Sequence, residues 1–260
     1  MVGEFNQEWA IILGGSSGLG LATAIKLAKE GLNICIIHRD PRANMEAINH
    51  SFNNIKIEAV NFVSYNIDAT SEEKQLFFMQ DFKLKIKDNK VKLLVHSLAK
   101  GALKSIIEQP KLSLEDFQIT MHAMALSLIS WTQKLHENNF FGEDSRIISF
   151  SSEGSSKVIP NYAAVSLAKA SLENLSRYIS VEMAKYGIKS NIIQAGVTDT
   201  QALRMIPNSD KIIKMTELRN PYNRLTTPSD VANVVYLLTK KEAFWINGAV
   251  IKVDGGESNV

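Results

Sequence analysis

Leu13-Gly14-Gly15-Ser16-Ser17-Gly18-Leu19-Gly20 is the stretch that decides how the rest of the chain is interpreted. It follows a short apolar run and opens a helical pattern. Glycine allows a tight turn and lets the backbone approach a ligand closely. The start of the following helix offers free N–H groups and the positive end of the helix dipole, which suit a pyrophosphate. The turn therefore favours dinucleotide binding over its alternative, an ordinary strand-to-helix connection.

Around this turn, short apolar runs alternate with longer helical patterns along all 260 residues. The alternation is typical of βαβ units, so we expect an α/β fold: a single Rossmann domain with a seven-stranded parallel sheet and helices on both faces. Ligands on such a sheet bind at the carboxyl ends of the strands. The expected strands are 10–13, 34–38, 57–62, 93–97, 147–150, 190–194 and 250–253, and the expected helices are 19–30, 71–87, 117–138, 162–186 and 229–238.

The composition points to an ordinary globular protein, with 45% hydrophobic and 22% charged residues. A net charge of +2 gives no reason to expect nucleic acid or a membrane surface as a partner. The single cysteine, Cys35, lies in an apolar run, which predicts a buried strand residue. One cysteine excludes a disulfide framework and argues against a thiolate metal site. No apolar run approaches the ~20 residues needed to span a bilayer. Together with the lack of disulfides, this leads us to expect a cytoplasmic protein. We also expect no metal site.

The end of the second expected strand bears on which dinucleotide binds. Rossmann enzymes that use NAD typically carry an acid there, whereas NADP enzymes need positive charge. Here His38 takes the place of the acid and Arg39 follows it, so we expect both to contact the cofactor and NADPH to be preferred over NADH. Arg42 is the second candidate for the phosphate. The alternative is two solvated arginines, and Asp40 could neutralise Arg39 or point at a ribose.

The spacing Gly14-x3-Gly18-x-Gly20 resembles the short-chain dehydrogenase/reductase superfamily, although Leu13 stands where that family usually has Thr. The resemblance implies that Asp68 contacts the adenine; its alternative role is a start signal for helix 71–87. The cofactor contacts that the resemblance implies, together with the glycine turn, are Gly14, Ser16, Ser17, Gly18, Leu19, Gly20, Asp68, Ser97, Ala99, Lys169, Gly196, Thr198 and Thr200.

Tyr162 and Lys169 are the expected catalytic pair. Seven residues make nearly two helical turns, so the two side chains share a face about 10.5 Å apart along the axis. In the superfamily a Tyr polarises or protonates the substrate oxygen, and a Lys binds the nicotinamide ribose and lowers the pKa of that Tyr. The usual Tyr-x3-Lys would place Lys at Ser166. The alternative interpretation is a buried aromatic residue and a solvated lysine.

The spacing Tyr-x6-Lys resembles the enoyl-acyl-carrier-protein reductases, and most closely their NADPH-dependent third isoform of bacilli. An enoyl thioester accepts hydride at its β-carbon, so the acid must lie farther from the hydride donor, where it stabilises an enolate. The segment His96-Ser97-Leu98-Ala99, His122 and the pair Ala195-Gly196 resemble the same branch. The resemblance implies a trans-2-enoyl thioester substrate, carried by acyl carrier protein or CoA, in fatty-acid or related biosynthesis.

Ser152 departs from that branch, in which many members have a second Tyr ten residues before the catalytic one. It also matches the catalytic Ser of the wider superfamily, and could hydrogen-bond the substrate carbonyl beside Tyr162. A ketoreductase acting on a 3-oxoacyl or polyketide substrate therefore remains the alternative enzyme. A low-activity NADPH-binding regulatory protein is the alternative from another class.

Residues 201–218 are expected to form a substrate lid of two short helices, broken at Pro207-Asn208-Ser209-Asp210. Apolar residues on this lid would bury an acyl chain and exclude water. Family members are usually homotetramers, so we expect a homotetramer or homodimer that packs through 117–138 and 162–186. The candidates for a basic rim that meets an acidic carrier protein are Lys157, Arg204, Lys211 and Lys214.

Overall fold

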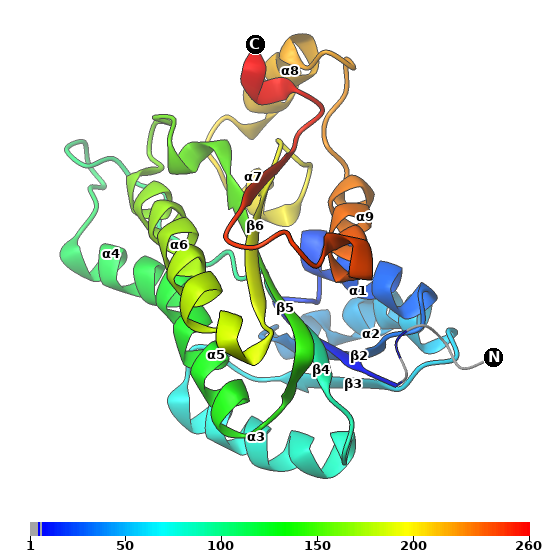
Figure 1. Cartoon of the computed structure of the whole chain (residues 1–260). Helices are drawn as coiled ribbons and strands as arrows, with labels where there is room; N and C mark the ends of the chain where they lie inside the picture. Colours follow the sequence, from blue (N-terminus) through cyan, green and yellow to red (C-terminus); the bar gives the residue numbers. More distant parts are fainter. Residues whose placement is uncertain (1–4, 6) are drawn as a thin grey trace.

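Seven parallel strands form one sheet in this computed structural model, which describes residue 5 and residues 7–260 (Figure 1). The order across the sheet is β3-β2-β1-β4-β5-β6-β7. This confirms the α/β fold with a parallel sheet that the alternating pattern predicted. The strands are β1 (Trp9–Leu13), β2 (Asn33–His38), β3 (Phe62–Asn66), β4 (Val91–His96), β5 (Phe141–Ser152), β6 (Lys189–Ala195) and β7 (Val250–Val253).

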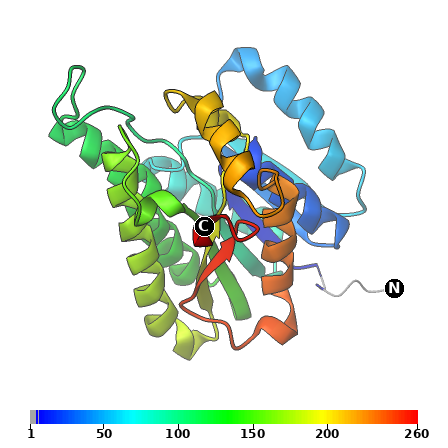
Figure 2. The same cartoon turned by 90° about the horizontal axis from the view of Figure 1, so that it is seen from above.

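Helices cover both faces of the sheet, as Figures 1 and 2 show. The side chains of β1 alternate between the two cores: Ile12 packs beneath one helical layer and Ile11 beneath the other. Because both faces are covered, β1, β2 and β4 are buried along their whole length. One layer contains α1 (Gly18–Lys29), α2 (Met45–Lys56) and α9 (Pro228–Thr239), and the other contains α3 (Glu72–Ile86), α5 (Ser127–Glu137) and α6 (Ala163–Glu182), with α4 (Leu114–Met121) packed on α6.

The remaining helices are short or lie outside these layers. Helix α8 and the C-terminal turn lie together at the top of Figure 1. The remaining helices and turns are α7 (Gln201–Arg204), α8 (Ser209–Arg219), the π-helical turn η2 (His122–Leu126) and the 3-10 turns η1 (Arg42–Asn44), η3 (Glu153–Ser155), η4 (Ala184–Tyr186), η5 (Lys241–Ala243) and η6 (Glu257–Asn259).

The predicted strand at 57–62 is wrong in all but its last residue. Strand β3 is Phe62–Asn66, and residues 57–61 lie in the turn after α2, a helix that was not predicted. Ile57 is 76% exposed, since it lies just beyond the end of α2. As an edge strand, β3 pairs only with β2 and buries chiefly Tyr65, so its sequence is less apolar than that of the central strands.

The predicted helix at 117–138 is interrupted. Helix α4 starts earlier, at Leu114, because the Ser113 hydroxyl and the Asp116 carboxylate cap its first turn reciprocally. At η2 the backbone widens by one residue per turn, so that the Ser127 amide donates to the His122 carbonyl. Such π turns often occur at functional sites, and this one borders the cleft described below.

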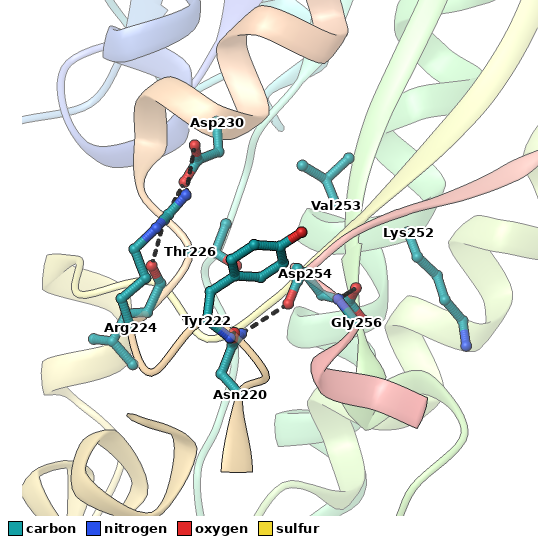
Figure 3. A pocket seen from close by; sticks show the side chains of 11 residues that line it. Asn220, Tyr222, Arg224, Thr226, Asp230, Lys252, Val253, Asp254 and Gly256 are labelled. Carbon is teal, nitrogen blue, oxygen red and sulfur yellow. Dashed lines mark hydrogen bonds and ion pairs between the residues drawn. The ribbon is translucent and has the colours of Figure 1, made fainter. Parts of the chain in front are cut away.

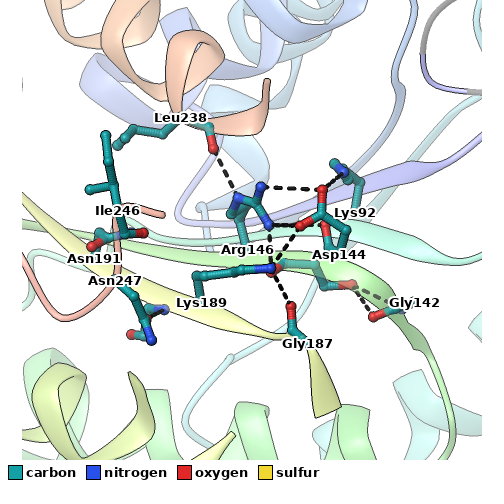
Figure 4. A network of polar contacts seen from close by, with 12 residues as sticks. Lys92, Gly142, Asp144, Arg146, Gly187, Lys189, Asn191, Leu238, Ile246 and Asn247 are labelled. Carbon is teal, nitrogen blue, oxygen red and sulfur yellow. Dashed lines mark hydrogen bonds and ion pairs between the residues drawn. The ribbon is translucent and has the colours of Figure 1, made fainter. Parts of the chain in front are cut away.

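A charged network ties the amino-terminal halves of β4, β5 and β6 together (Figure 4). The Asp144 carboxylate accepts hydrogen bonds from Lys92, Lys189 and Arg146, and these hydrogen bonds hold its pKa well below the usual range although burial opposes that shift. Arg146 is 1% exposed and also donates from Nε to the carbonyl of Leu238. The network lies at the end of the sheet opposite to the carboxyl ends of the strands, so it stabilises the fold without touching the site.

Residue 5 and residues 7–260 contain neither a candidate membrane-spanning helix nor a candidate metal cluster. No helix in this part of the chain is long and apolar enough to cross a membrane. Within the same residues, His, Cys, Asp and Glu side chains do not gather in threes in a way that could hold a metal ion. Cys35 is buried, as predicted.

Candidate active site

A cleft of about 540 Å³ opens at the carboxyl ends of the central strands. The chain passes from β1 to β2 on one side of the sheet and returns through β4 on the other, and ligands of doubly wound sheets bind at this change of direction. Twelve of the predicted site residues line the cleft: Gly14, Ser17, Gly18, Leu19, Ser97, Ala99, Ser152, Tyr162, Lys169, Gly196, Thr198 and Thr200.

The glycine turn is built to hold the backbone close to its neighbours. Gly14 has a φ of +81°, and a Cβ there would lie 2.6 Å from the Ser97 carbonyl oxygen. A Cβ on Gly20 would lie 2.2 Å from the Gly14 carbonyl oxygen. Ser16 and Gly20 are outside the lining of the cleft, so Gly20 serves the turn by packing.

The first turn of α1 points free N–H groups at the cleft. Ser17 is the N-cap, but its side chain makes no capping hydrogen bond, and no acidic residue stands in the first turn. Unsatisfied N–H groups at a helix start bind anions. The turn therefore fits the pyrophosphate of a dinucleotide.

The residues at the end of β2 make pairs other than those considered from the sequence. Asp40 does not neutralise Arg39; its Oδ2 lies 2.8 Å from Nδ1 of His38, which is 3% exposed. The partner of Arg39 is Asp68, with 2.6 Å between Nη1 and Oδ2. The Arg39 side chain is 61% exposed, and Arg42 is exposed in η1. His38, Arg39 and Asp68 all lie outside the lining of the cleft.

Asp68 is also fixed by the loop that follows β3. Its Oδ1 accepts hydrogen bonds from the amide and the hydroxyl of Thr70. Burial would raise the pKa of Asp68, but the bonds from Thr70 and the Arg39 charge outweigh it, so the pKa is lowered. The start signal of α3 is Ser71, whose hydroxyl accepts from the Lys74 amide, and not Asp68.

Tyr162 stands at the start of α6 with its hydroxyl 3.5 Å from the Ser152 hydroxyl, at the end of β5. Burial raises the pKa of Tyr162, and the bond to Ser152 offsets only part of that rise. The ring packs against Gly154, where a Cβ would lie 2.7 Å from a ring carbon. Gly154 is a site residue that the sequence analysis missed, because its role depends on a ring eight positions away.

Lys169 is buried and lines the cleft, so the alternative of a solvated lysine is wrong. Its Nζ donates to the Phe150 carbonyl oxygen at 2.6 Å. Burial lowers the pKa of Lys169 to about 8, against an opposing effect of Glu173 one turn farther along α6. The expected lowering of the pKa of Tyr162 is not found, since that pKa is raised overall.

The two histidines near the site differ in their surroundings. His96 is fully buried, with Nε2 2.8 Å from the Ser127 hydroxyl, and burial followed by the nearby Lys169 charge lowers its pKa to about 3. It is therefore neutral. Nε2 of His122 lies 3.1 Å from the Thr70 carbonyl oxygen, and His122 does not line the cleft.

The lid has the form predicted for it: α7 and α8 are two short helices separated at Pro207 and Asn208. Its apolar side chains close one side of the cleft. The rim is less basic than expected, because Arg204 is paired with Asp199 and Asp210. Lys157 is paired with Glu153, whereas Lys211 and Lys214 are exposed. The lid residues that line the cleft are Gln201, Ala202, Leu203, Met205, Ile206 and Ile212.

A second cavity, of about 550 Å³, lies between the end of β7 and the start of α9 (Figure 3). Its main polar groups bind one another. Arg224 makes two hydrogen bonds to Asp230, which also accepts from the Thr227 amide, and Asn220 donates to the Asp254 carbonyl. The cleft, which brings Tyr162, Ser152 and Lys169 beside the glycine turn, is therefore the candidate active site.

Comparison with known proteins agrees with this geometry. Residues 14–258 match the sequence model of a family described as enoyl-(acyl carrier protein) reductase. An NADH-dependent enoyl-acyl-carrier-protein reductase, FabI, of Aquifex aeolicus is 34% identical over 144 residues, which cover 55% of this chain and 53% of that protein. The match thus spans about half the length of this relative.

Other similar proteins are matched over more of their length. The FabI protein of Buchnera aphidicola is 31% identical over 185 residues, which cover 65% of this chain and 70% of the relative. The 3-oxoacyl-acyl-carrier-protein reductase MabA of Mycobacterium tuberculosis is 27% identical over 253 residues, which cover 97% and 93%. The solved Aquifex aeolicus enoyl reductase has the same fold, with a TM-score of 0.85, 24% identity and 97% of each chain covered. The chain therefore belongs to the enoyl-acyl-carrier-protein reductase family of the short-chain dehydrogenase/reductase superfamily.

Proposed function

We propose that the protein is an enzyme that uses NADPH to reduce the 2,3 double bond of a trans-2-enoyl thioester, carried by acyl carrier protein or CoA. The observation that carries this proposal is the pair of Tyr162 and Lys169, which lie seven positions apart and line one cleft. The uncapped start of α1 and the close-packed Gly14 fit a dinucleotide. When bound, the nicotinamide would supply hydride to the β-carbon.

The side chains at the cleft fit the charges that this reaction develops. The raised pKa of Tyr162 keeps its hydroxyl protonated at neutral pH, so that it can donate to the carbonyl oxygen as the enolate forms. Ser152 lies within reach of the same oxygen. With a pKa of about 8, Lys169 is mostly charged at pH 7 and can donate to a ribose hydroxyl. Solvent or a relay then protonates the α-carbon.

The preference for NADPH rests on Arg39. Its exposed guanidinium has donors beyond the one that binds Asp68, and a guanidinium can bind a phosphate through two parallel hydrogen bonds. In Arg39→Gln we expect kcat/KM to fall about tenfold with NADPH and little with NADH, since one charge-assisted bond to the 2′-phosphate is lost. Arg42→Gln tests the second candidate, and a loss confined to NADPH in that variant alone would assign the phosphate to Arg42 instead. Equal losses with both cofactors would contradict this role.

The substrate test compares crotonyl and acetoacetyl thioesters, each with NADPH and with NADH, by the loss of absorbance at 340 nm. Faster turnover of the crotonyl thioester supports the proposal. Turnover of the acetoacetyl thioester alone would favour the alternative function, a 3-oxoacyl ketoreductase. The 3.5 Å contact between the hydroxyls of Ser152 and Tyr162 is the observation that favours this alternative. Tyr162→Phe should lower kcat at least about 100-fold, as removal of an oxyanion donor does. Unchanged cellular function of Tyr162→Phe would instead indicate a regulatory NADPH-binding protein.

We also propose a homotetramer or homodimer. Apolar side chains remain exposed on α6, the helix expected to pack across subunits: Leu167 is 49%, Tyr178 61% and Val181 76% exposed. Exposed apolar surface of this kind often marks an interface. Light scattering after size-exclusion chromatography would show a mass of two or four chains, and a single-chain mass would contradict the proposal.

A further inference from the structure

Arg219, the last residue of α8, directly follows the lid (201–218) and joins it to two other parts of the chain. Its Nη2 donates to Oε1 of Glu257 at 2.5 Å and lies 3.2 Å from Oε2 of Glu153. Glu153 directly follows Ser152 at the end of β5, and Glu257 belongs to the C-terminal turn η6. Both glutamates line the cleft. The guanidinium of Arg219 thus connects the lid to the end of β5 and to η6, both of which border the cleft.

Glu257 uses both of its oxygens at once. While Oε1 accepts from Arg219, Oε2 accepts from the amide of Val197 at 3.2 Å. Val197 lies between Gly196 and Thr198, two of the residues expected to contact the cofactor. Since Glu257 is only 3% exposed, this carboxylate is held between the lid and the loop after β6.

The two ends of the lid are held differently. At its end, Asn220 follows Arg219 and donates to the Asp254 carbonyl, and both Arg219 and Asn220 are at least partly buried. At its beginning, Arg204 pairs with Asp199 and Asp210, and all three side chains are well exposed. An exposed ion pair contributes little to stability, whereas loss of one partner of a buried pair leaves an uncompensated charge and is strongly destabilising. The ion pairs at Arg219 are therefore the less exposed of the two sets that hold the lid.

We propose that Glu257 is a positioning residue that couples the lid to the loop 196–198, so that closure of the lid over an acyl group and the placement of the nicotinamide depend on one another. It acts through Arg219 and Val197 and does not touch the reacting atoms. The proposal rests on the proposed function, because it assumes that an acyl thioester and a nicotinamide occupy this cleft.

Glu257→Gln tests the proposal, since it keeps the shape of the side chain and removes its charge. We expect KM for crotonyl thioester to rise on the order of tenfold, the loss expected for one charge-assisted hydrogen bond, with a smaller fall in kcat. In hydrogen–deuterium exchange of the enzyme without substrate, peptides from 196–200 and 201–218 should exchange faster than in the wild type. Arg219→Lys, which keeps the charge, should show a smaller change in the same peptides.

Asp230→Asn is the matched control. Asp230 also accepts from an arginine, Arg224, and from a backbone amide, that of Thr227, but it lies in the second cavity (Figure 3). The Asp230→Asn variant should leave KM for crotonyl thioester and the hydrogen–deuterium exchange of peptides from 201–218 unchanged. The proposal is overturned if Glu257→Gln lowers thermal stability without faster exchange of the peptides from 196–200 and 201–218. It is also overturned if Glu257→Gln and Asp230→Asn speed that exchange equally. Absent turnover of crotonyl thioester in the wild type would refute the proposed function alone, because the exchange result would still decide on the coupling. Should Glu257→Gln fail to fold, Arg219→Lys decides by the same exchange measurement.

Discussion

Lys169 should impose an alkaline limit on activity near pH 8. A lysine whose pKa is lowered to about 8 loses its proton as the pH rises through that value, well below the ordinary 10.5. It is about nine tenths protonated at pH 7 and about one tenth at pH 9. If the charged form holds the nicotinamide ribose, kcat/KM should fall about tenfold per pH unit above 8. This fall in kcat/KM is the alkaline limb of the pH profile. Tyr162 does not account for it, since burial raises the pKa of Tyr162 from its ordinary value of 10.

The assay is the initial rate of NADPH oxidation with crotonyl thioester from pH 6 to pH 10, at limiting NADPH. The charged and titratable groups near Lys169 are Glu173 on its own helix and His96 on β4, and Tyr162 lines the same cleft. Glu173→Gln should move the limb to lower pH, because the Glu173 charge raises the pKa of Lys169. In Lys169→Arg the limb should disappear, since arginine stays charged throughout this range. A wild-type profile that is flat to pH 10, or a limb near 8 that persists in Lys169→Arg, would refute the reasoning.

Three further variants test other parts of the structure. Gly20→Ala should raise the Kd for NADPH at least about tenfold by fluorescence titration, because its Cβ would lie 2.2 Å from backbone; Gly142→Ala, with its nearest atom at 3.4 Å, should not. Asp144→Asn should lower the free energy of unfolding in urea by about 3 kcal/mol, since it leaves buried cations without their partner; a loss below about 1 kcal/mol would contradict that role. Ser152→Ala should lower any activity with acetoacetyl thioester more than tenfold but that with crotonyl thioester only a few-fold, because its hydroxyl lies 3.5 Å from Tyr162; equal losses would point to one shared role.

The fold and the centre of the site could be predicted because both depend on local patterns. Strand β2 is apolar and buried on both faces. Gly14 has a positive φ and lies against the Ser97 backbone, so this turn requires a glycine. Strand β3 was misplaced because an edge strand buries one side only, so its pattern is weak beside Ile57 and Val60, the apolar residues in the turn after α2. The interruption at η2 could not be predicted, since the apolar residues Ala123, Met124 and Ala125 continue the helical pattern through it.

The pairings at the site could not be predicted from spacing. Arg39 and Asp68 are 29 positions apart, and only the adjacency of β2 and β3 brings them together. The burial of Lys169 follows from the elements packed around α6, which a helical pattern does not reveal. Glu257 gave no signal at all, because its role arises from contacts with Arg219 and Val197, two segments distant in the sequence.

The uncapped start of α1 has a practical consequence for the choice of buffer. N–H groups that await a pyrophosphate also accept smaller oxyanions, so inorganic phosphate or sulfate should compete with the cofactor there. Affinities for NADPH measured in phosphate buffer would then come out too weak, and crystals grown from sulfate would tend to hold an anion beside Ser17. Kinetic work on this enzyme is therefore best begun in an organic amine buffer, with phosphate added back as a competitor of known concentration.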